Sequence, residues 1–269
     1  MSSIGFIGAG NMAQAIINGI IQAQQFAPAD VMVSDISGDR LVWLAKKYGV
    51  TAVSNNTAIA DNADIIVLSV KPQIMAGVLE EIKPSIKKTS VVISIAAGIT
   101  IDSISQILGD TQIIRVMPNT PSLVSEGMSG LYSPNASDNT MQNALEIFSA
   151  IGKAVIVDKE DLIDAVTAVS GSGPAYYFLM MEEMVKSGQK LGLSQEIATK
   201  LVIQTAKGAA ILAEIAQLNG ETAEELRRKV TSPGGTTEAA INSFKDDNID
   251  KLVEKAMTAA YDKSKELSG

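Results

Sequence analysis

A run of small residues near the start of the chain, Gly8-Ala9-Gly10-Asn11-Met12-Ala13, directly follows a short apolar segment. Its G-x-G-x-x-A spacing is typical of a strand, turn and helix that bind a dinucleotide. The first glycine permits a tight turn, the second lets backbone approach a pyrophosphate, and Ala13 allows close helix packing. The N-terminus of the following helix then offers N–H groups and positive dipole to the phosphates. The alternative is a tight turn that binds nothing.

Asp35 stands at the end of the second predicted strand. It lies 22 residues after Ala13, close to the spacing of about 20 residues expected between the glycine motif and a ribose-binding acid. An acid there favours the 2′-hydroxyl of NAD. The nearby donors Ser34, Ser37 and Arg40 could instead hold the 2′-phosphate of NADP. Both cofactor forms, NADH and NADPH, therefore stay open, and a third interpretation is that Asp35 only caps a turn.

Small and polar residues also follow the other predicted strands, where the crevice of a doubly wound sheet lies. The candidates for contact with the cofactor are Asn56, Ser69, Lys71, Pro72, Ala96, Ala97 and Gly98. Asn119, between Pro118 and Pro121, could hydrogen-bond the nicotinamide carboxamide or a bound substrate. Ordinary loop and turn structure is the alternative at each of these positions.

A second chemical motif is the hydroxyl- and glycine-rich loop Lys229-Val230-Thr231-Ser232-Pro233-Gly234-Gly235-Thr236-Thr237-Glu238, set between two predicted helices. Backbone N–H groups of Gly234, Gly235 and Thr236 at a helix entrance would form an anion site for a small carboxylate. Alternatively, Ser232 or Thr236 only caps the following helix. The concentration of hydroxyl and glycine residues in an aliphatic region favours the binding site.

The elements that must position these motifs change in character near residue 160. Short β-branched runs alternate with helical segments up to about residue 157, which is typical of a parallel sheet covered by helices. We expect strands over residues 4–7, 31–34, 65–69, 91–95, 113–116 and 154–157, with weaker candidates over 50–53 and 128–132. The predicted fold is α/β: an N-terminal Rossmann-type, doubly wound, mostly parallel sheet over residues 1–160, then a C-terminal all-helical domain over residues 161–269.

The helical region carries more apolar surface than one face of a helix requires. Residues 194–216 are apolar over so wide an arc that burial on more than one side is expected. Burial within the domain is one solution and homodimerisation is the other. Residues 249–269 are expected to form a solvent-facing amphipathic helix with alternating charges.

Composition excludes several classes of chemistry and partner. The 269 residues include no histidine and no cysteine, which excludes a Ser-His-Asp triad, a cysteine nucleophile, a histidine base and a thiolate or imidazole zinc site. We therefore predict no metal. The formal net charge of −8 opposes binding to nucleic acid or anionic lipid.

Apolar runs such as residues 65–70 have strand length and fall short of the ~20 residues of a membrane helix. Residues 2–21 lack the basic start of a signal peptide. We expect a cytoplasmic protein with no membrane partner.

Read together in this order, the motifs resemble those of the pyrroline-5-carboxylate reductases. The resemblance is most specific in residues 229–244, Lys-Val-Thr-Ser-Pro-Gly-Gly-Thr-Thr-Glu-Ala-Ala-Ile-Asn-Ser-Phe, and extends over residues 7–12, 69–72, 96–98, 117–120 and 170–175. It implies reduction of 1-pyrroline-5-carboxylate to L-proline, the last step of proline biosynthesis, with NADPH or NADH. It also implies a helical dimerisation domain, in a homodimer or a higher oligomer built from dimers, whose active site combines one subunit's nucleotide domain with the other's helices.

The same resemblance assigns roles to individual residues. Those that would line the cofactor are Gly8, Ala9, Gly10, Asn11, Met12, Ser34, Asn56, Ser69, Lys71, Pro72, Ala96, Ala97 and Gly98. Those that would meet the substrate are Val230, Ser232, Gly234, Gly235, Thr236 and Thr237. Asp35 departs from the neutral or basic residues that many relatives carry there, so the implied NADP preference is not secure for this chain.

The chemistry of a cyclic imine requires a hydride at carbon and a proton on nitrogen, and an iminium can arrive already protonated from water. Thr237 is the candidate catalytic residue, because its hydroxyl can hydrogen-bond the ring nitrogen. Two other functions fit the sequence less well. A β-hydroxyacid dehydrogenase generally uses a lysine near the start of the second domain's first long helix, but residues 174–185 contain none. A non-catalytic NAD(P)-binding regulator would leave the loop around Thr237 unexplained.

Overall fold

The computed structural model describes residues 3–268. The chain divides into two compact units. The first, which we call the sheet unit, comprises Met1–Pro174 with Ala259–Gly269, and the second, the helical unit, comprises Ala175–Thr258.

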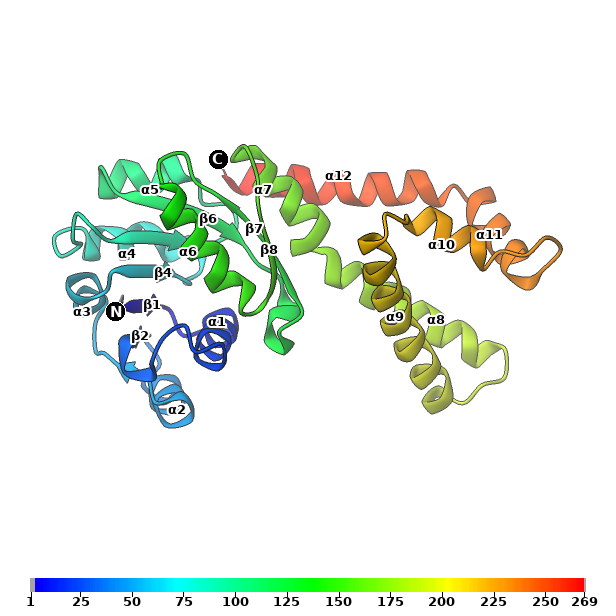
Figure 1. The fold of residues 1–269 in the computed structure, drawn as a ribbon, viewed down its shortest axis with the longest axis horizontal. Helices are drawn as coiled ribbons and strands as arrows, with labels where there is room; N and C mark the ends of the chain where they lie inside the picture. The colour runs from blue at the N-terminus through cyan, green and yellow to red at the C-terminus, as the bar shows by residue number, and fades with distance from the viewer. Residues whose placement is uncertain (1–2, 269) are drawn as a thin grey trace. The chain divides into compact units, whose positions relative to one another are not determined.

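The sheet unit is built on one mostly parallel sheet, which confirms the predicted fold class (Figure 1). In the described residues its order is β3-β2-β1-β4-β5-β6-β7-β8, and only the β6–β7 pair is antiparallel. The strands are β1 (Ile4–Ile7), β2 (Val31–Ser34), β3 (Thr51–Ala52), β4 (Ile65–Leu68), β5 (Val91–Ser94), β6 (Gln112–Met117), β7 (Gly127–Tyr132) and β8 (Gly152–Ile156). The two weaker strand candidates are both real, although β3 has only two residues.

Helices cover both faces of this sheet, which is why its central strands are apolar at nearly every position. Phe6 belongs to the core on one face and the adjacent Ile7 to the core on the other. The first core includes side chains from α1 (Asn11–Gln22), α2 (Gly38–Tyr48) and α6 (Asp138–Ser149). The second includes side chains from α3 (Asn56–Asn62), α4 (Met75–Ile82) and α5 (Ile101–Leu108).

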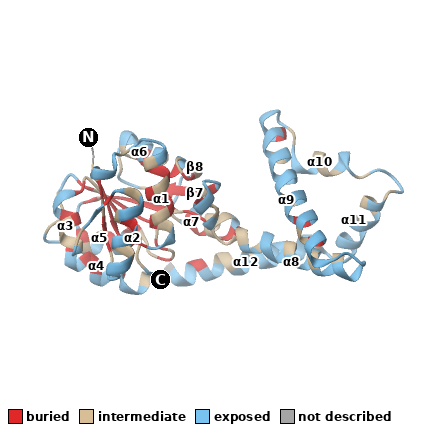
Figure 2. Cartoon of the chain, turned by 90° about the horizontal axis from the view of Figure 1, so that it is seen from below, coloured by how far each residue is buried: buried red, intermediate tan, exposed pale blue. Residues whose placement is uncertain are grey.

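After β8 the described chain is helical, as predicted. The helices are α7 (Asp161–Val166), α8 (Gly173–Lys190), α9 (Gln195–Leu218), α10 (Ala223–Lys229), α11 (Thr236–Asp246) and α12 (Ile249–Ser268), with a π-helical turn at Thr167–Gly171. Few of their apolar side chains are buried (Figure 2). Within α9 the buried residues are Ala198, Val202 and Ala216, so the helical unit does not cover its own apolar surface.

Two observations on the helices bear on the expectations from sequence. In the described residues α9 is long and apolar enough to cross a membrane by length and composition alone, although polar residues are spread along it. The final helix is not solvent-facing throughout. Residues 259–269 belong to the sheet unit, where the Ser264 side chain is buried.

Candidate functional site

Three loops meet at the carboxyl ends of β1, β2 and β4. In the sheet, β1 pairs with β2 on one side and with β4 on the other, so the strand order reverses direction beside β1. The carboxyl ends of the strands at such a switch point are where ligands bind in sheets of this kind. The Gly8 N–H donates to the Ser34 carbonyl oxygen at 2.9 Å, and the Ser69 hydroxyl donates to the Gly8 carbonyl oxygen at 2.6 Å. The predicted cofactor residues Gly8, Ser34 and Ser69 are therefore brought together by direct bonds.

The glycine turn has the form that a pyrophosphate needs. Gly8 has a φ of +96°, and a Cβ there would lie 2.7 Å from the Ser69 carbonyl oxygen, so only glycine fits. Gly10 is the N-cap of α1, a Cβ on it would meet open space, and the first turn of α1 contains no acidic side chain. Asn11 and Met12 form that first turn. The open N-terminus of α1 thus fits an anionic group of a dinucleotide.

The Asp35 carboxylate is held by backbone on both sides. One oxygen accepts from the Ala9 N–H at 2.7 Å and the other from the Ser37 N–H at 2.8 Å. Arg40 crosses the same turn, donating from Nε to the Ala9 carbonyl oxygen at 2.7 Å and from a terminal nitrogen to Gln14 Oε1 at 2.6 Å. The end of β2 and the glycine turn therefore form one hydrogen-bonded structure.

Asn56 belongs to the same edge of the sheet. Its Oδ1 accepts from the buried Ser34 hydroxyl at 2.7 Å, and its Nδ2 donates to Glu81 Oε2 at 2.7 Å. Asn55, not Asn56, caps α3, because the Asn55 side chain accepts from the Ala58 N–H. The Asn56 side chain therefore does not cap the helix, and its oxygen fixes the Ser34 hydroxyl.

The remaining predicted cofactor residues follow β4, β5 and β6. Lys71 is exposed and Pro72 opens a short 3₁₀ helix, Pro72–Ile74. Ala96 and Gly98 are buried and Ala97 is partly exposed. Asn119 is buried; its Nδ2 donates to the Ser170 carbonyl oxygen at 2.9 Å, and its Oδ1 accepts from the Met128 N–H at 2.9 Å. These two bonds give Asn119 a structural task, and its contact with cofactor or substrate stays a prediction.

The substrate loop, residues 230–237, lies in the helical unit between α10 and α11. Gly235 is the N-cap of α11, so the interpretation of Ser232 or Thr236 as the cap is wrong. Thr236 and Thr237 form the first turn of α11, with Thr236 exposed and Thr237 half-buried. This arrangement presents hydroxyls and N–H groups at a helix N-terminus, as an anion site requires.

Two of the three N–H groups predicted to hold a carboxylate already have partners. The Gly234 N–H donates to Glu238 Oε2 at 2.7 Å, and the Gly235 N–H donates to the Ser232 carbonyl oxygen at 3.0 Å. Gly234 has a φ of +72°, which favours glycine. Val230, the first residue of the loop, is exposed. The Glu238 carboxylate therefore occupies the kind of position that a substrate carboxylate would take.

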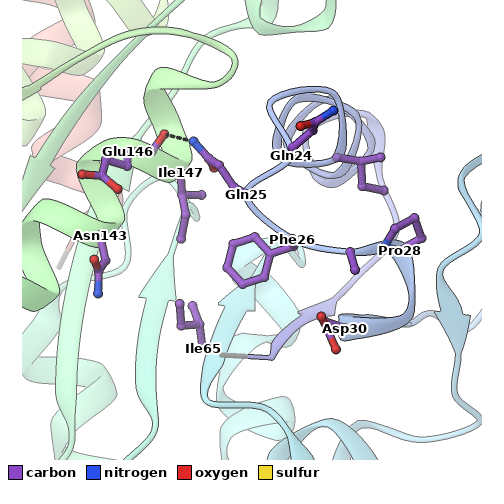
Figure 3. A pocket seen from close by; sticks show the side chains of 11 residues that line it. Gln24, Gln25, Phe26, Pro28, Asp30, Ile65, Asn143, Glu146 and Ile147 are labelled. Carbon is purple, nitrogen blue, oxygen red and sulfur yellow. Dashed lines mark hydrogen bonds between the residues drawn. The ribbon is translucent and has the colours of Figure 1, made fainter. Parts of the chain in front are cut away.

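A well-defined cavity lies at the opposite edge of the sheet from the glycine turn. It has a volume of ≈ 580 Å³ and is lined by residues that include Phe26, Asp30 and Ile65 (Figure 3). The Gln25 side chain donates to the Glu146 carbonyl oxygen beside it. Ile65 is the first residue of β4, so this cavity is at the amino ends of the strands and is not the dinucleotide crevice.

Three side chains at these sites were not singled out from the sequence. Gln14 accepts a hydrogen bond from Arg40, which is 26 residues away in the sequence, and Glu81 accepts one from Asn56, which is 25 residues away. Nothing in the local sequence indicates these partners. Glu238 could have been found, because an acid in the first turn of a helix commonly accepts from N–H groups there. The structure thus adds Glu238 to the substrate loop.

Comparison with known proteins covers the whole chain. The family model for pyrroline-5-carboxylate reductase dimerisation matches residues 160–267, and that for NADP oxidoreductase, coenzyme F420-dependent, matches residues 3–98. A pyrroline-5-carboxylate reductase of Pseudomonas aeruginosa is 46% identical over 268 residues, 98% of this chain and 96% of that protein.

Solved structures give the same result. The pyrroline-5-carboxylate reductase of Coxiella burnetii matches with a TM-score of 0.92 at 42% identity, covering 100% of this chain and 99% of that one. The Plasmodium falciparum pyrroline carboxylate reductase, solved with NADP bound, matches with a TM-score of 0.87 at 32% identity, covering 100% and 98%.

Proposed function

The chain belongs to the pyrroline-5-carboxylate reductase family, and on this premise we infer that it reduces 1-pyrroline-5-carboxylate to L-proline with NAD(P)H. It is an enzyme of proline biosynthesis. The observation that carries the assignment on physical grounds is the glycine turn, where an uncapped helix N-terminus faces open space beside Gly10. That turn suits a dinucleotide, and the family supplies the substrate.

The reaction adds a hydride to the imine carbon and a proton to the imine nitrogen, and the nicotinamide supplies the hydride when bound. Gly8, Gly10 and the N-terminus of α1 would hold the pyrophosphate through backbone N–H groups. The Asn56 and Ser34 pair and the Ala96–Ala97–Gly98 turn would line the remaining crevice. None of these groups needs to exchange a proton, which agrees with a chain that has neither histidine nor cysteine.

For the substrate, we place the carboxylate at the N-terminus of α11. The N–H groups of Thr236 and Thr237, in the first turn of α11, would donate to this carboxylate. The Gly234 N–H already donates to Glu238. The Thr237 hydroxyl would then hydrogen-bond the ring nitrogen and orient it toward the hydride donor. Val230 and Ser232 would form the adjacent wall.

The enzyme is a homo-oligomer through its dimerisation domain. More specifically, we propose a homodimer, or a higher assembly built from dimers, with an active site that is complete only in the homodimer. The exposed apolar surface of α9 supports this proposal, because a second copy would cover it without lipid. The net negative charge supports a protein that binds neither nucleic acid nor anionic membrane, and we propose a cytoplasmic location. We keep residues 1–160 and 161–269 as the proposed functional division.

The direct test follows NADH and NADPH absorbance separately with 1-pyrroline-5-carboxylate and purified enzyme. We expect oxidation that depends on the imine and yields proline in equal amount. Absence of oxidation with both cofactors would reject the proposed reaction.

A further inference from the structure

The loop after β2 separates two forms of the cofactor, which differ only in the group on the 2′-position of the adenosine ribose. NADH carries a hydroxyl there, which can donate a hydrogen bond, and NADPH carries a phosphate, which can only accept. The side chains on this loop therefore decide which form binds better.

We propose that this chain selects NADH over NADPH and that Asp35 is the residue that determines the choice. The inference rests on the proposed function for the identity of the bound cofactor, but it concerns only the residues at the end of β2. It is carried by the fixed position of the Asp35 carboxylate and by the partners that Arg40 and Ser34 already have within the chain.

The carboxylate is held in place by backbone. Its two oxygens accept from the Ala9 and Ser37 N–H groups at 2.7 and 2.8 Å. These bonds hold the carboxylate beside the glycine turn. An ionised carboxylate has about four lone-pair positions, so two backbone bonds leave capacity for ribose hydroxyls. It has no proton to share with a phosphate, and the two negative charges would repel each other.

Arg40, the strongest candidate for binding a phosphate, is directed elsewhere. Its Nε donates to the Ala9 carbonyl oxygen and a terminal nitrogen donates to Gln14 Oε1. Its guanidinium also lies 4.7 Å from the centre of the Trp43 ring. A guanidinium with these three partners braces the glycine turn, and two of its three nitrogens are used in doing so.

The two serines are engaged as well. The Ser34 hydroxyl donates to Asn56 Oδ1 at 2.7 Å, and the Ser37 side chain caps α2 by accepting from the Arg40 N–H. Asp39 lies in the first turn of α2, and the Ser37 side chain already serves the N-terminus of that helix as an acceptor. The carboxylate held against the glycine turn is that of Asp35.

Ile36 completes the description. It is fully exposed, although it is a large apolar side chain directly after Asp35. An exposed isoleucine beside a ribose-binding acid can cover one face of an adenine ring, which is apolar and uncharged. A cationic side chain at position 36 would compensate the charge of a 2′-phosphate, but this chain carries isoleucine there.

The test compares NADH and NADPH in two ways: kcat/KM with 1-pyrroline-5-carboxylate, and direct binding followed by nucleotide fluorescence in the absence of substrate. We expect the wild-type enzyme to prefer NADH by roughly tenfold or more in both measurements, since one poorly compensated charge pair is worth at least that factor. A wild-type preference for NADPH would overturn the inference.

Asp35→Asn removes the charge and keeps an oxygen that can accept from the Ala9 N–H. We expect the NADH to NADPH ratio to fall to about one, because repulsion of the phosphate is lost. The matched control, Asp39→Asn, makes the same change in net charge nearby in the sequence, in the first turn of α2, and should leave the ratio as in wild type. A loosened turn would weaken both cofactors equally, so an unchanged ratio in Asp35→Asn would reject the assignment to Asp35.

Arg40→Ala distinguishes the opposite model. We expect it to weaken both cofactors to a similar extent, since Arg40 braces the shared glycine turn; a loss confined to NADPH would show that Arg40 reads the phosphate and would overturn the inference. If neither cofactor is oxidised with the imine but NADH still binds in preference, the proposed reaction fails and the assignment of cofactor choice stands.

Discussion

At the scale of single residues, Thr237 is the side chain that we propose to act on the substrate. It lies in the first turn of α11, half-buried, where a hydroxyl can reach an imine nitrogen. We predict that Thr237→Ala lowers kcat by up to about tenfold, because an orienting hydrogen bond contributes roughly 0.5–1.5 kcal/mol. NADH affinity should change little. Steady-state kinetics and cofactor binding measure the two effects.

The size of the loss separates orientation from proton transfer. A residue that delivers the proton would be expected to contribute about 10²- to 10⁴-fold. Thr237→Ser keeps the hydroxyl and should recover most of the activity. If Thr237→Ala had the kcat and KM of the wild type, Thr237 would have no part in the reaction.

Residue types and spacing predicted the glycine turn, Asp35 and the substrate loop as candidate site residues, because each has a local physical requirement. Gly8 needs a positive φ, and only glycine adopts it without strain. The partners of these residues were not predictable, because Arg40 reaches the Ala9 carbonyl oxygen only after α1, β1 and α2 have packed. Local sequence therefore predicted the candidate residues, and tertiary contacts determine which partners their side chains have.

At the scale of elements, the end of α12 packs on the turn that follows β5. A Cβ on Gly98 would lie 2.7 Å from the Leu267 Cβ and 2.8 Å from the Leu267 carbonyl oxygen, and Gly98 has a φ of +72°. We predict that Gly98→Ala lowers the free energy of unfolding by about 1–3 kcal/mol and raises the KM for NADH, because the turn must move.

Gly77→Ala is the matched control for this change. Gly77 lies in α4, where a Cβ would meet nothing within 4 Å, so alanine there should stabilise the helix by up to about 1 kcal/mol. Chemical denaturation and cofactor kinetics test both variants. A Gly98→Ala enzyme as stable as the wild type would show that α12 does not constrain the turn.

A second anchor of this kind is buried. The Ser264 hydroxyl on α12 donates to Asp164 Oδ1 at 2.6 Å, and Arg115 lies 3.5 Å from the same oxygen. We predict that Ser264→Ala costs about 1–3 kcal/mol of unfolding free energy, since a buried carboxylate loses a donor. Denaturant titration measures it, and a change of less than about 0.5 kcal/mol would contradict the anchoring role.

The start of β4 offers a pH-dependent contact. The Ser3 backbone N–H donates to Asp64 Oδ2 at 2.9 Å, and this bond, with help from the Ser3 hydroxyl and Lys87, holds the pKa of Asp64 below its ordinary value of 3.8. Because the folded pKa is depressed, the contribution is fully present above the unfolded pKa and is lost as pH falls through the folded one. Asp64→Asn should therefore be less stable than wild type at neutral pH and equal to it in strong acid.

Elements with a strong local pattern were predictable and those set by their neighbours were not. The strands β1 and β2 have the predicted limits, because runs of apolar residues buried on both faces end where turn residues begin. The antiparallel pairing of β7 with β6 was not evident, since the direction of a strand depends on how the chain returns to the sheet. The packing of residues 259–268 on the sheet unit was not predicted either, because an amphipathic pattern with alternating charges does not show which element its apolar face contacts.

At the scale of the whole molecule, the apolar surface of the helical unit is the feature that one copy leaves unsatisfied. Exposed positions on α9 include Ile203, Ile211 and Leu212, each about half accessible. Contiguous apolar surface of this kind marks an interface. The sequence predicted an excess of apolar residues here but could not say what covers them, because a pattern shows that a face must be buried and does not identify its partner.

Oligomerisation should therefore contribute directly to stability. We predict that Leu212→Glu shifts the enzyme toward monomer in sedimentation analysis, because a charge placed in an apolar interface must be desolvated without a partner. Wild-type Tm should rise with protein concentration, as it does when association is coupled to folding. In the variant this dependence should weaken, and imine reduction should fall together with the loss of the dimer.

Val42→Glu provides the control, since Val42 is an exposed apolar residue on α2 of the sheet unit. It should leave the sedimentation coefficient unchanged, because a charge on an already solvated face costs little. Binding of NADH distinguishes loss of assembly from loss of folding: the glycine turn belongs to the sheet unit, so a monomeric Leu212→Glu chain should still bind the cofactor while it fails to reduce the imine. A fully active monomer would contradict the proposal that the active site is complete only in the homodimer.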